Sequence, residues 1–443
     1  MKTFTLSKIT TLLICLMCSA WAMGQNAAWS LKDCIDYAIA NNIAIKQAQN
    51  KIEQNKLTKD TRKWARLPDL NASAGQNWSW GRSPSPIDNS YSDVRSMNIN
   101  YSIATSAPIF TGLEIPNQYA LAKLDLKASV EDLNKAKEDL SINVTSQYVQ
   151  VLFNQELEGI AQQQVDLSKE QLNRGSELYK VGKLSIAELA ELKSRVMQDE
   201  LRHVETKNNY NLALLDLSQM LELTTPEGFS IVPMDGPLTF EPLTAPDIIY
   251  QNALLFKPQI LAAQFRYQGA QKSIRIAQSG YMPKLSFNAN MGSGYYYVQG
   301  RSAKNLGEQA SDNLNKYIGF SLSVPIFNRF STRNQVRNAR LGLNNQLLQL
   351  ENEKKILYKE IQQAWYNATA AETKHLSSQT ALGASSESFL LIKEKYELGQ
   401  SNNLEFNEAK VNLMKAESDN LQAKYEYLFR VKILNFYKGQ MID

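Results

Sequence analysis

Four segments of the chain alternate apolar and polar residues with a period of two, which is typical of β-strands with one apolar face. Their polar positions are occupied by Asn, Ser and Gly rather than by Lys and Glu. We expect polar loops within each pair of strands, from Gly81 to Ser96 and from Ser302 to Asp312. The strands are predicted at about residues 69–80, 97–110, 284–298 and 314–327.

Most of the remaining chain has apolar residues at three- and four-residue spacing, which predicts α-helices. The first predicted helix covers residues 31–66, and Pro68 would end it. Two much longer stretches, from Pro116 to Tyr179 and from Asn334 to Tyr396, contain no internal proline. If continuous, each would be about 90 to 100 Å long. Stretches of this length favour helices that pack on one another in coiled-coil style.

A glycine and a capping sequence follow each long helix and predict a helical hairpin. Gly182 and Gly399 supply the left-handed conformation that ends a helix. Ser185 and Asn402 then act as N-cap residues, each with a Glu three positions later. The hairpins are expected at about residues 115–220 and 331–437, with their turns at 179–185 and 396–402.

The chain repeats itself at a fixed offset. Ala107 to Phe110 recurs 217 positions later as Val324 to Phe327, and Tyr179 to Gly182 recurs as Tyr396 to Gly399. So long a period excludes a solenoid and indicates a duplicated unit. The division predicted is a signal peptide at 1–24, a first repeat at 25–222, a linker rich in Pro and Gly at 223–246, and a second repeat at 247–443.

The N-terminal residues predict export. Lys2 and Lys8 precede a short apolar run, and small residues follow it as a cleavage site requires. After cleavage only Cys34 would remain of the three cysteines, so no internal disulfide can form. We expect Cys34 to be a half-buried apolar residue.

Charge and chemistry exclude several classes of function. The chain has 48 Lys and Arg against 44 Asp and Glu, which gives no reason to expect nucleic acid. The two histidines, His203 and His375, lie on helical stretches without neighbouring Cys or His, and we expect both to be exposed. No phosphate-binding loop or nucleophile elbow is present. We therefore predict no enzyme activity, no catalytic residues, no cofactor and no metal.

The strands also fit an ordinary soluble sheet, because alternation alone does not distinguish it from a membrane barrel. The barrel is favoured by the polar face of Asn, Ser and Gly and by aromatic residues near the strand ends. Four strands cannot close a barrel, so several chains would share one, and three chains would supply twelve strands. The aromatic residues expected at the membrane interface are Trp78, Trp80, Tyr295 and Tyr297.

With these features the chain resembles the TolC-type outer-membrane efflux proteins over nearly its whole mature length. The resemblance implies an α+β membrane protein with a duplicated unit of long coiled-coil helices and a β-hairpin. It implies a homotrimer with a twelve-stranded transmembrane β-barrel in the lipid of the outer membrane and an α-helical barrel in the periplasm. The partners implied are a periplasmic adaptor and an inner-membrane pump of the RND or ABC type, in tripartite efflux or type I secretion.

The resemblance also implies roles for the hairpin turns. Acidic residues just past the second turn narrow the tunnel of the family, and Glu405 and Glu408 match them here, with Glu188 and Glu191 as counterparts in the first repeat. Some members have an arginine latch where this chain has Ser401, so we do not expect an arginine-based latch. The residues expected to contact the adaptor are Tyr179, Gly182, Tyr396 and Gly399.

Several of these features also fit other interpretations. Capping alone explains Glu188 and Glu405, whereas Glu191 and Glu408 lie one turn deeper. Long helical hairpins also fit a soluble periplasmic adaptor or scaffold protein. The sequence does not specify the cargo, and the scattered methionines do not point to copper or silver.

Overall fold

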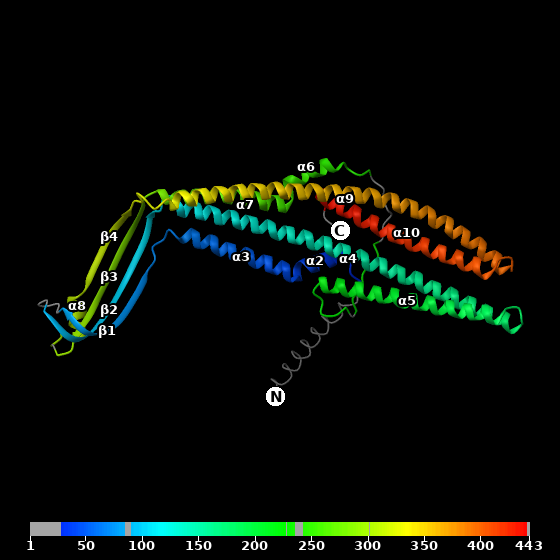
Figure 1. Ribbon diagram of the computed structural model, residues 1–443, viewed down its shortest axis with the longest axis horizontal. Helices are drawn as coiled ribbons and strands as arrows, with labels where there is room; N and C mark the ends of the chain where they lie inside the picture. Colours follow the sequence, from blue (N-terminus) through cyan, green and yellow to red (C-terminus); the bar gives the residue numbers. More distant parts are fainter. Residues whose placement is uncertain (1–27, 85–89, 227, 235–241, 301, 441–443) are drawn as a thin grey trace, which may run out of the picture. The chain divides into compact units, whose positions relative to one another are not determined.

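The computed structural model describes residues 28–84, 90–226, 228–234, 242–300 and 302–440 (Figure 1). The predicted signal peptide lies outside the described residues. The chain divides into two compact units. One unit comprises the chain up to Gln49 together with residues 132–260 and 353–443, and the other comprises residues 50–131 and 261–352. Each unit takes segments from both sequence repeats.

The second of these units contains one antiparallel sheet in the order β1-β2-β3-β4 (Figure 1). The expected loop from Gly81 to Ser96 is too long, because Gly81 pairs with Val94 and Trp80 with Arg95. Backbone pairing continues through these residues regardless of how polar their side chains are. The fourth strand ends earlier than expected, two residues before Pro325, which cannot donate to a ladder. The strands are β1 (Asn71–Pro84), β2 (Tyr91–Phe110), β3 (Lys284–Val298) and β4 (Asn315–Ser323).

The register of the sheet brings the apolar positions of all four strands onto one face. Ala107 pairs with Phe287, and Phe287 pairs in turn with Phe320. On the opposite face Ser102 pairs with Gly292. Directly paired residues share a face, so the alternation of each strand adds to that of its neighbour.

The segment between β3 and β4 is not the simple loop expected from Ser302 to Asp312. It contains a short helix, α8 (Leu306–Asp312), capped by Asn305. β4 pairs with β3 only as far as Gly292, and α8 covers the strand edge beyond it. The Gln309 side chain accepts from the Tyr296 N–H at 2.9 Å and donates to the Tyr296 carbonyl at 3.1 Å. This side chain takes the place of a neighbouring strand at that edge.

The long helices begin at a two-residue left-handed turn that both repeats share. Gly112 and Leu113 have φ of 64° and 67°, and Arg329 and Phe330, at the same offset of 217, have φ of 54° and 61°. The helices that follow are α4 (Glu114–Lys180) and α9 (Ser331–Glu397), each of 67 residues. Both are continuous, as the absence of proline predicts. The first part of each long helix belongs to the second unit and the remainder to the first unit. The second unit also contains most of α3 (Ile43–Trp64), most of α7 (Pro258–Gln278) and the short η1 (Ser279–Tyr281).

The predicted helix over 31–66 is divided at Asn42 into α2 (Leu31–Asn41) and α3. The Asn42 side-chain oxygen accepts from the Ala44 N–H at 2.9 Å, which caps the new helix start. A side chain that can bond its own backbone offers an alternative to a continuous helix. The spacing of apolar residues does not reveal this competition, so the sequence pattern predicted one continuous helix.

The first unit also holds α5 (Ile186–Met220), α6 (Pro246–Phe256) and α10 (Asn403–Tyr437). Its main core joins α2 to α4, α5 and α10 and includes Cys34, which is fully buried rather than half-buried. Burial raises the pKa of the Cys34 thiol to about 12. Part of the linker belongs to this core: Ile231 is buried and forms a parallel bridge with Trp29. The Tyr148 hydroxyl donates to the Val232 carbonyl at 2.5 Å.

Within the described residues, no helix has both the length and the apolar character needed to cross a bilayer.

Candidate functional site at the helical hairpins

The turns of the two helical hairpins have the same backbone geometry. Gly182 and Gly399 each have φ of 74°, where an L side chain would be strained. The Lys183 N–H donates to the Leu178 carbonyl at 2.8 Å, and the Gln400 N–H donates to the Lys395 carbonyl at 2.8 Å. These bonds close each long helix with the motif that its glycine predicts.

The helix starts after the turns differ. Ser185 and Glu188 form a complete capping box, and the hydrogen bonds from the Ser185 side chain and backbone lower the pKa of the Glu188 carboxyl. In the second hairpin the Asn402 side chain caps the Glu405 N–H at 2.9 Å. The Glu405 carboxylate, however, accepts from the Ser401 hydroxyl at 2.6 Å. Both hydrogen bonds of a capping box are therefore present for Glu188. For Glu405 only one is present, from its N–H to the Asn402 side chain.

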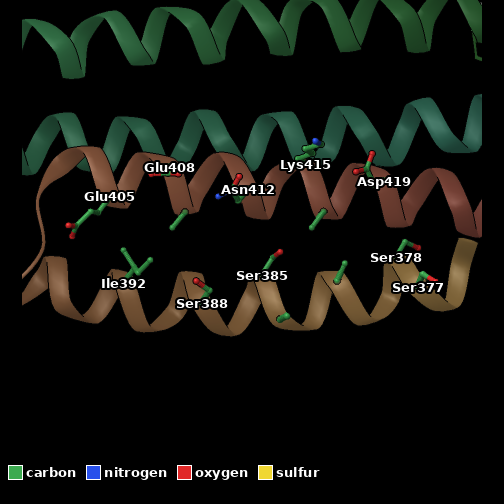
Figure 2. Close-up of a pocket in the computed structure, with 14 residues that line it drawn as sticks. Ser377, Ser378, Ser385, Ser388, Ile392, Glu405, Glu408, Asn412, Lys415 and Asp419 are labelled. Carbon is green, nitrogen blue, oxygen red and sulfur yellow. The ribbon is translucent and has the colours of Figure 1, made fainter.

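Glu405 and Glu408 line an open groove of about 800 Å³ between α9 and α10 (Figure 2). Asn412, Lys415 and Asp419 continue this row along α10 at spacings of three and four residues, so they share one helix face. The facing side of α9 is made of small residues, chiefly Ser and Ala, and ends at Ile392. The groove thus presents three carboxylates and one ammonium group opposite a floor of small side chains.

The carboxylates of the first repeat lie elsewhere. Glu188 and Glu191 are exposed, and both raise the pKa of the Tyr396 phenol, although burial is the larger cause. They therefore lie near the end of α9 and do not line the groove that contains Glu405 and Glu408. Within one chain, the four acidic candidates form two separate groups.

The two tyrosines at the turns also differ. Tyr396 packs against Phe406 with ring centroids 4.7 Å apart, and the Arg174 guanidinium lies 5.8 Å from the Tyr396 ring centroid. Tyr179 is 41% exposed. Tyr396 is thus a packing residue of the second hairpin, whereas Tyr179 lies on the surface of the first. Apolar residues next to both turns are exposed as well: Val181, Ile186, Leu398 and Leu404.

A buried charged cluster below the turns was not predicted. The Lys410 ammonium group donates to the Asp199 carboxylate at 2.8 Å, the Ser168 hydroxyl at 2.5 Å and the Gln164 carbonyl at 3.3 Å. Its side chain is 3% exposed, and burial lowers the pKa of Lys410 against the opposing effect of Asp199. The cluster joins α10 to α4 and α5. Its counterpart in the first repeat, Lys193, is exposed, so no sequence signal distinguished the two lysines.

The histidine prediction was wrong for His375. This side chain is 6% exposed, and its ring stacks on Tyr427 with centroids 6.2 Å apart. Burial, followed by the charge of Lys424, lowers the pKa of His375. His203 is partly buried, and its Nε2 lies 3.0 Å from the Glu158 carboxylate. Among the residues that the structure describes, no group of three His, Cys, Asp or Glu side chains is arranged to hold a metal ion.

The aromatic residues predicted for a membrane interface all lie on the apolar face of the sheet. Trp78 pairs with Met97, which pairs with Tyr297, and Tyr295 pairs with Ile99 on the same face. Trp78 is 58% exposed and Trp80 is 67% exposed. So large an exposed apolar surface is unusual for a soluble sheet and marks a contact with lipid or protein.

Comparison with known proteins decides which class of protein carries these features. The sequence profile of the family described as "Outer membrane efflux protein" matches residues 34–222 and 249–439, one stretch in each repeat. The chain belongs to this family. It is an outer-membrane efflux channel protein with a periplasmic helical part, and its family consists of non-enzymes. The resemblance, the efflux function and the location predicted from the sequence are thereby confirmed.

Individual members of the outer membrane efflux protein family are distant in sequence but close in fold. Outer membrane protein TolC of Escherichia coli is 22% identical over 373 residues, covering 82% of this chain and 72% of that protein. The CmeC outer membrane channel of Campylobacter jejuni has a TM-score of 0.80 at 19% identity, over 92% of this chain and 85% of that one. The open MtrE channel of Neisseria gonorrhoeae has a TM-score of 0.74 at 19% identity, over 92% and 88%. These structures show that the duplicated fold is shared.

Proposed function

We propose that this efflux channel protein works as a homotrimer, a passive exit duct that docks to a periplasmic adaptor and an inner-membrane pump. The observation that carries the proposal is the sheet. Its apolar face is exposed, and within the described residues neither β1 nor β4 pairs with another strand along its outer edge. Edges of this kind are not tolerated in lipid. Three copies joined edge to edge would remove all six edges and form one twelve-stranded barrel.

The helices support the same assembly, because a helix face that is covered in the second repeat is exposed in the first repeat. α10 packs on α4, because Lys410 donates hydrogen bonds to Gln164 and Ser168 of α4, and Met414 of α10 is buried. The matching face of α5 is uncovered: Met197, Leu201 and Val204 follow one another at coiled-coil spacing and are each about 60% exposed. A neighbouring copy would cover α5 as α4 covers α10. Because the uncovered face differs from its partner face, such a contact would be head-to-tail, and with a three-fold rotation it would close into a ring.

The hairpin turns are the proposed docking surface for the adaptor. The exposed side chains of Tyr179 and Val181 at the first turn and Leu398 at the second form apolar spots that the described chain leaves uncovered. The carboxylates of Glu405 and Glu408 would line the lumen near this end and favour cations. In the trimer each of these two carboxylates would occur three times, once from each chain, around the lumen.

The assembly is tested with the purified protein. Native mass spectrometry should show three chains, and planar bilayers should show a stable cation-selective conductance. Replacing Glu405 and Glu408 by Gln should lower the cation selectivity. Replacing Glu387 and Glu394, exposed carboxylates on α9 outside the groove, should leave it unchanged. A monomer without conductance would overturn the exit-duct proposal.

Topology separates an exit duct from a soluble periplasmic adaptor. Cys34 is buried, so a single introduced cysteine can be labelled selectively. Ser311→Cys, in α8, should react with a membrane-impermeant maleimide on intact cells. Lys183→Cys, beside the first hairpin turn, should react only after the outer membrane is permeabilised. Equal protection of both positions in intact cells would favour the soluble adaptor.

A further inference from the structure

A pocket of about 410 Å³ lies where the second unit passes from strand to helix. One wall is formed by Arg62 and Lys63 at the end of α3 and by Arg66 just after it. The rest is formed by Pro108, Ile109, Phe110, Thr111, Leu113, Ile115, Pro116 and Tyr119. Among the residues that the structure describes, none that lines the pocket is acidic. Three cations over an apolar floor suit a ligand with an anionic head and an apolar body.

The three cations are not used by the protein for ion pairs within the described residues. Arg62 Nη1 donates to the Gln118 side-chain oxygen at 3.1 Å, and Lys63 Nζ lies 4.6 Å from the Trp64 ring centroid. Glu114, the one acidic residue within 108–119, forms an ion pair with Lys284 at 2.8 Å. Cations at the end of α3 also complement the helix dipole. The dipole does not explain why apolar residues surround them.

The apolar part of the pocket is held open to solvent by the left-handed turn. Leu113 has φ of 67°, a conformation that leucine rarely adopts, and its side chain is 57% exposed. Phe330, the matching residue of the second repeat, has φ of 61° and is also 57% exposed. Two bulky apolar residues in a strained conformation and facing solvent indicate that something apolar covers them.

The pocket is continuous with the apolar face of the sheet. Phe110 lines the pocket and pairs with Leu285, which pairs with Leu322 on β4. Phe110 is 40% exposed and Leu322 is 65% exposed. If that face meets lipid, as the proposed function requires, an acyl chain lying on it would reach the pocket without crossing a polar surface.

We propose that this pocket binds an anionic phospholipid of the membrane leaflet on the helical side of the sheet. The phosphate lies against Arg62, Lys63 and Arg66, and an acyl chain lies on Leu113 and Phe110. The proposal rests on the proposed function, because it places the end of the sheet at the membrane surface. The lipid would fix the depth at which each subunit sits, since charge and apolar contact must be satisfied together.

The test measures binding of short-chain lipids to the purified trimer in a neutral detergent. The probes are dihexanoyl-phosphatidylglycerol, dihexanoyl-phosphatidylcholine and inorganic phosphate. Each cation near an anionic lipid contributes about fivefold in affinity. Replacing Arg62, Lys63 and Arg66 by Gln should therefore weaken phosphatidylglycerol binding at least tenfold. Phosphatidylcholine should bind more weakly than phosphatidylglycerol and lose little in this variant.

A charge-matched control lies on the same helix. Replacing Lys51, Lys56 and Lys59 by Gln removes three cations from α3 outside the pocket, and phosphatidylglycerol affinity should change less than twofold. Leu113→Gly keeps the left-handed turn and removes the apolar side chain. It should weaken the lipid severalfold while inorganic phosphate binding is unchanged, a result that a purely structural role for Leu113 would not produce.

The outcomes separate this site from the channel itself. Equal phosphatidylglycerol binding by the wild type and the pocket variant overturns the lipid site, even if both form conducting trimers. Binding of inorganic phosphate as tightly as of phosphatidylglycerol also overturns it, because the pocket would then be an anion site only. Failure of the wild type to form a trimer or to conduct ions counts against the exit-duct proposal. Native mass spectrometry and planar bilayers measure this without any lipid probe.

Discussion

Removing the carboxylate from the buried Lys410 cluster should destabilise the first unit more than removing the ammonium group does. In Asp199→Ala, Lys410 stays at 3% exposure with only two neutral acceptors, Ser168 and Gln164. Breaking a buried pair in this way costs about 3 to 5 kcal/mol, because the remaining charge stays desolvated. Asp199 is 12% exposed, which places the expected loss near the lower end, at about 3 kcal/mol.

The reverse change is milder. In Lys410→Met the Asp199 carboxylate keeps the hydrogen bond from the Ser168 hydroxyl and is partly reached by water. The expected loss is about 1.5 kcal/mol, the size of one hydrogen bond to a charged group. The double variant Lys410→Met with Asp199→Leu leaves no buried charge and should lie within about 1 kcal/mol of the wild type. Lys193→Met, the exposed counterpart, should change stability by less than about 0.5 kcal/mol.

Hydrogen exchange read by mass spectrometry suits this prediction, because it reports local opening free energies within a large assembly. Peptides of α10 around position 410 should exchange about a hundredfold faster in Asp199→Ala than in the wild type, since about 1.4 kcal/mol is tenfold. Peptides from the sheet should be unchanged. The reasoning is refuted if Lys410→Met exchanges faster than Asp199→Ala, or if the double variant shows the sum of the two single effects.

Three further predictions concern the hairpins and the core. Gly399→Ala should lower stability by about 1 kcal/mol, because φ is 74° at this position. Gly383→Ala should raise stability by about 1 kcal/mol, because Gly383 lies inside α9 with free space around it. Thermal melts followed by circular dichroism compare the two variants. Ser185→Ala should cost about 1 kcal/mol at pH 7. The pKa of Glu188 is lowered in the folded protein, so the stability that its carboxylate contributes is complete above about pH 4.5 and is lost as the pH falls through the folded pKa. The loss of stability in Ser185→Ala should therefore be smaller in acid melts. A loss that stays constant with pH would contradict this cause. Cys34 should resist maleimide at pH 7.5 until the protein unfolds, because the thiol is buried with a pKa of about 12, and rapid labelling of the folded protein would show that the core opens readily.

Local patterns in the sequence determined much of the architecture. The glycines at the hairpin turns, the capping residues after them and the absence of proline in the long helices each act within a few residues, so their effect does not depend on the rest of the chain. Alternation likewise predicted the four strands and their apolar face. The errors lie where local rules compete. Asn42 divides a helix through its own side chain, and backbone pairing carries β1 and β2 past the polar residues expected to form a loop.

The environments of residues that the two repeats share depend on tertiary packing. Lys193 and Lys410 occupy equivalent positions, as do Met197 and Met414, yet the first of each pair is exposed and the second is buried. The reason is that burial depends on what packs against a helix from elsewhere in the chain. α4 lies on α10, while the matching face of α5 is uncovered within one chain. The sequence determined that the unit is duplicated; the packing decided that its two copies are not equivalent.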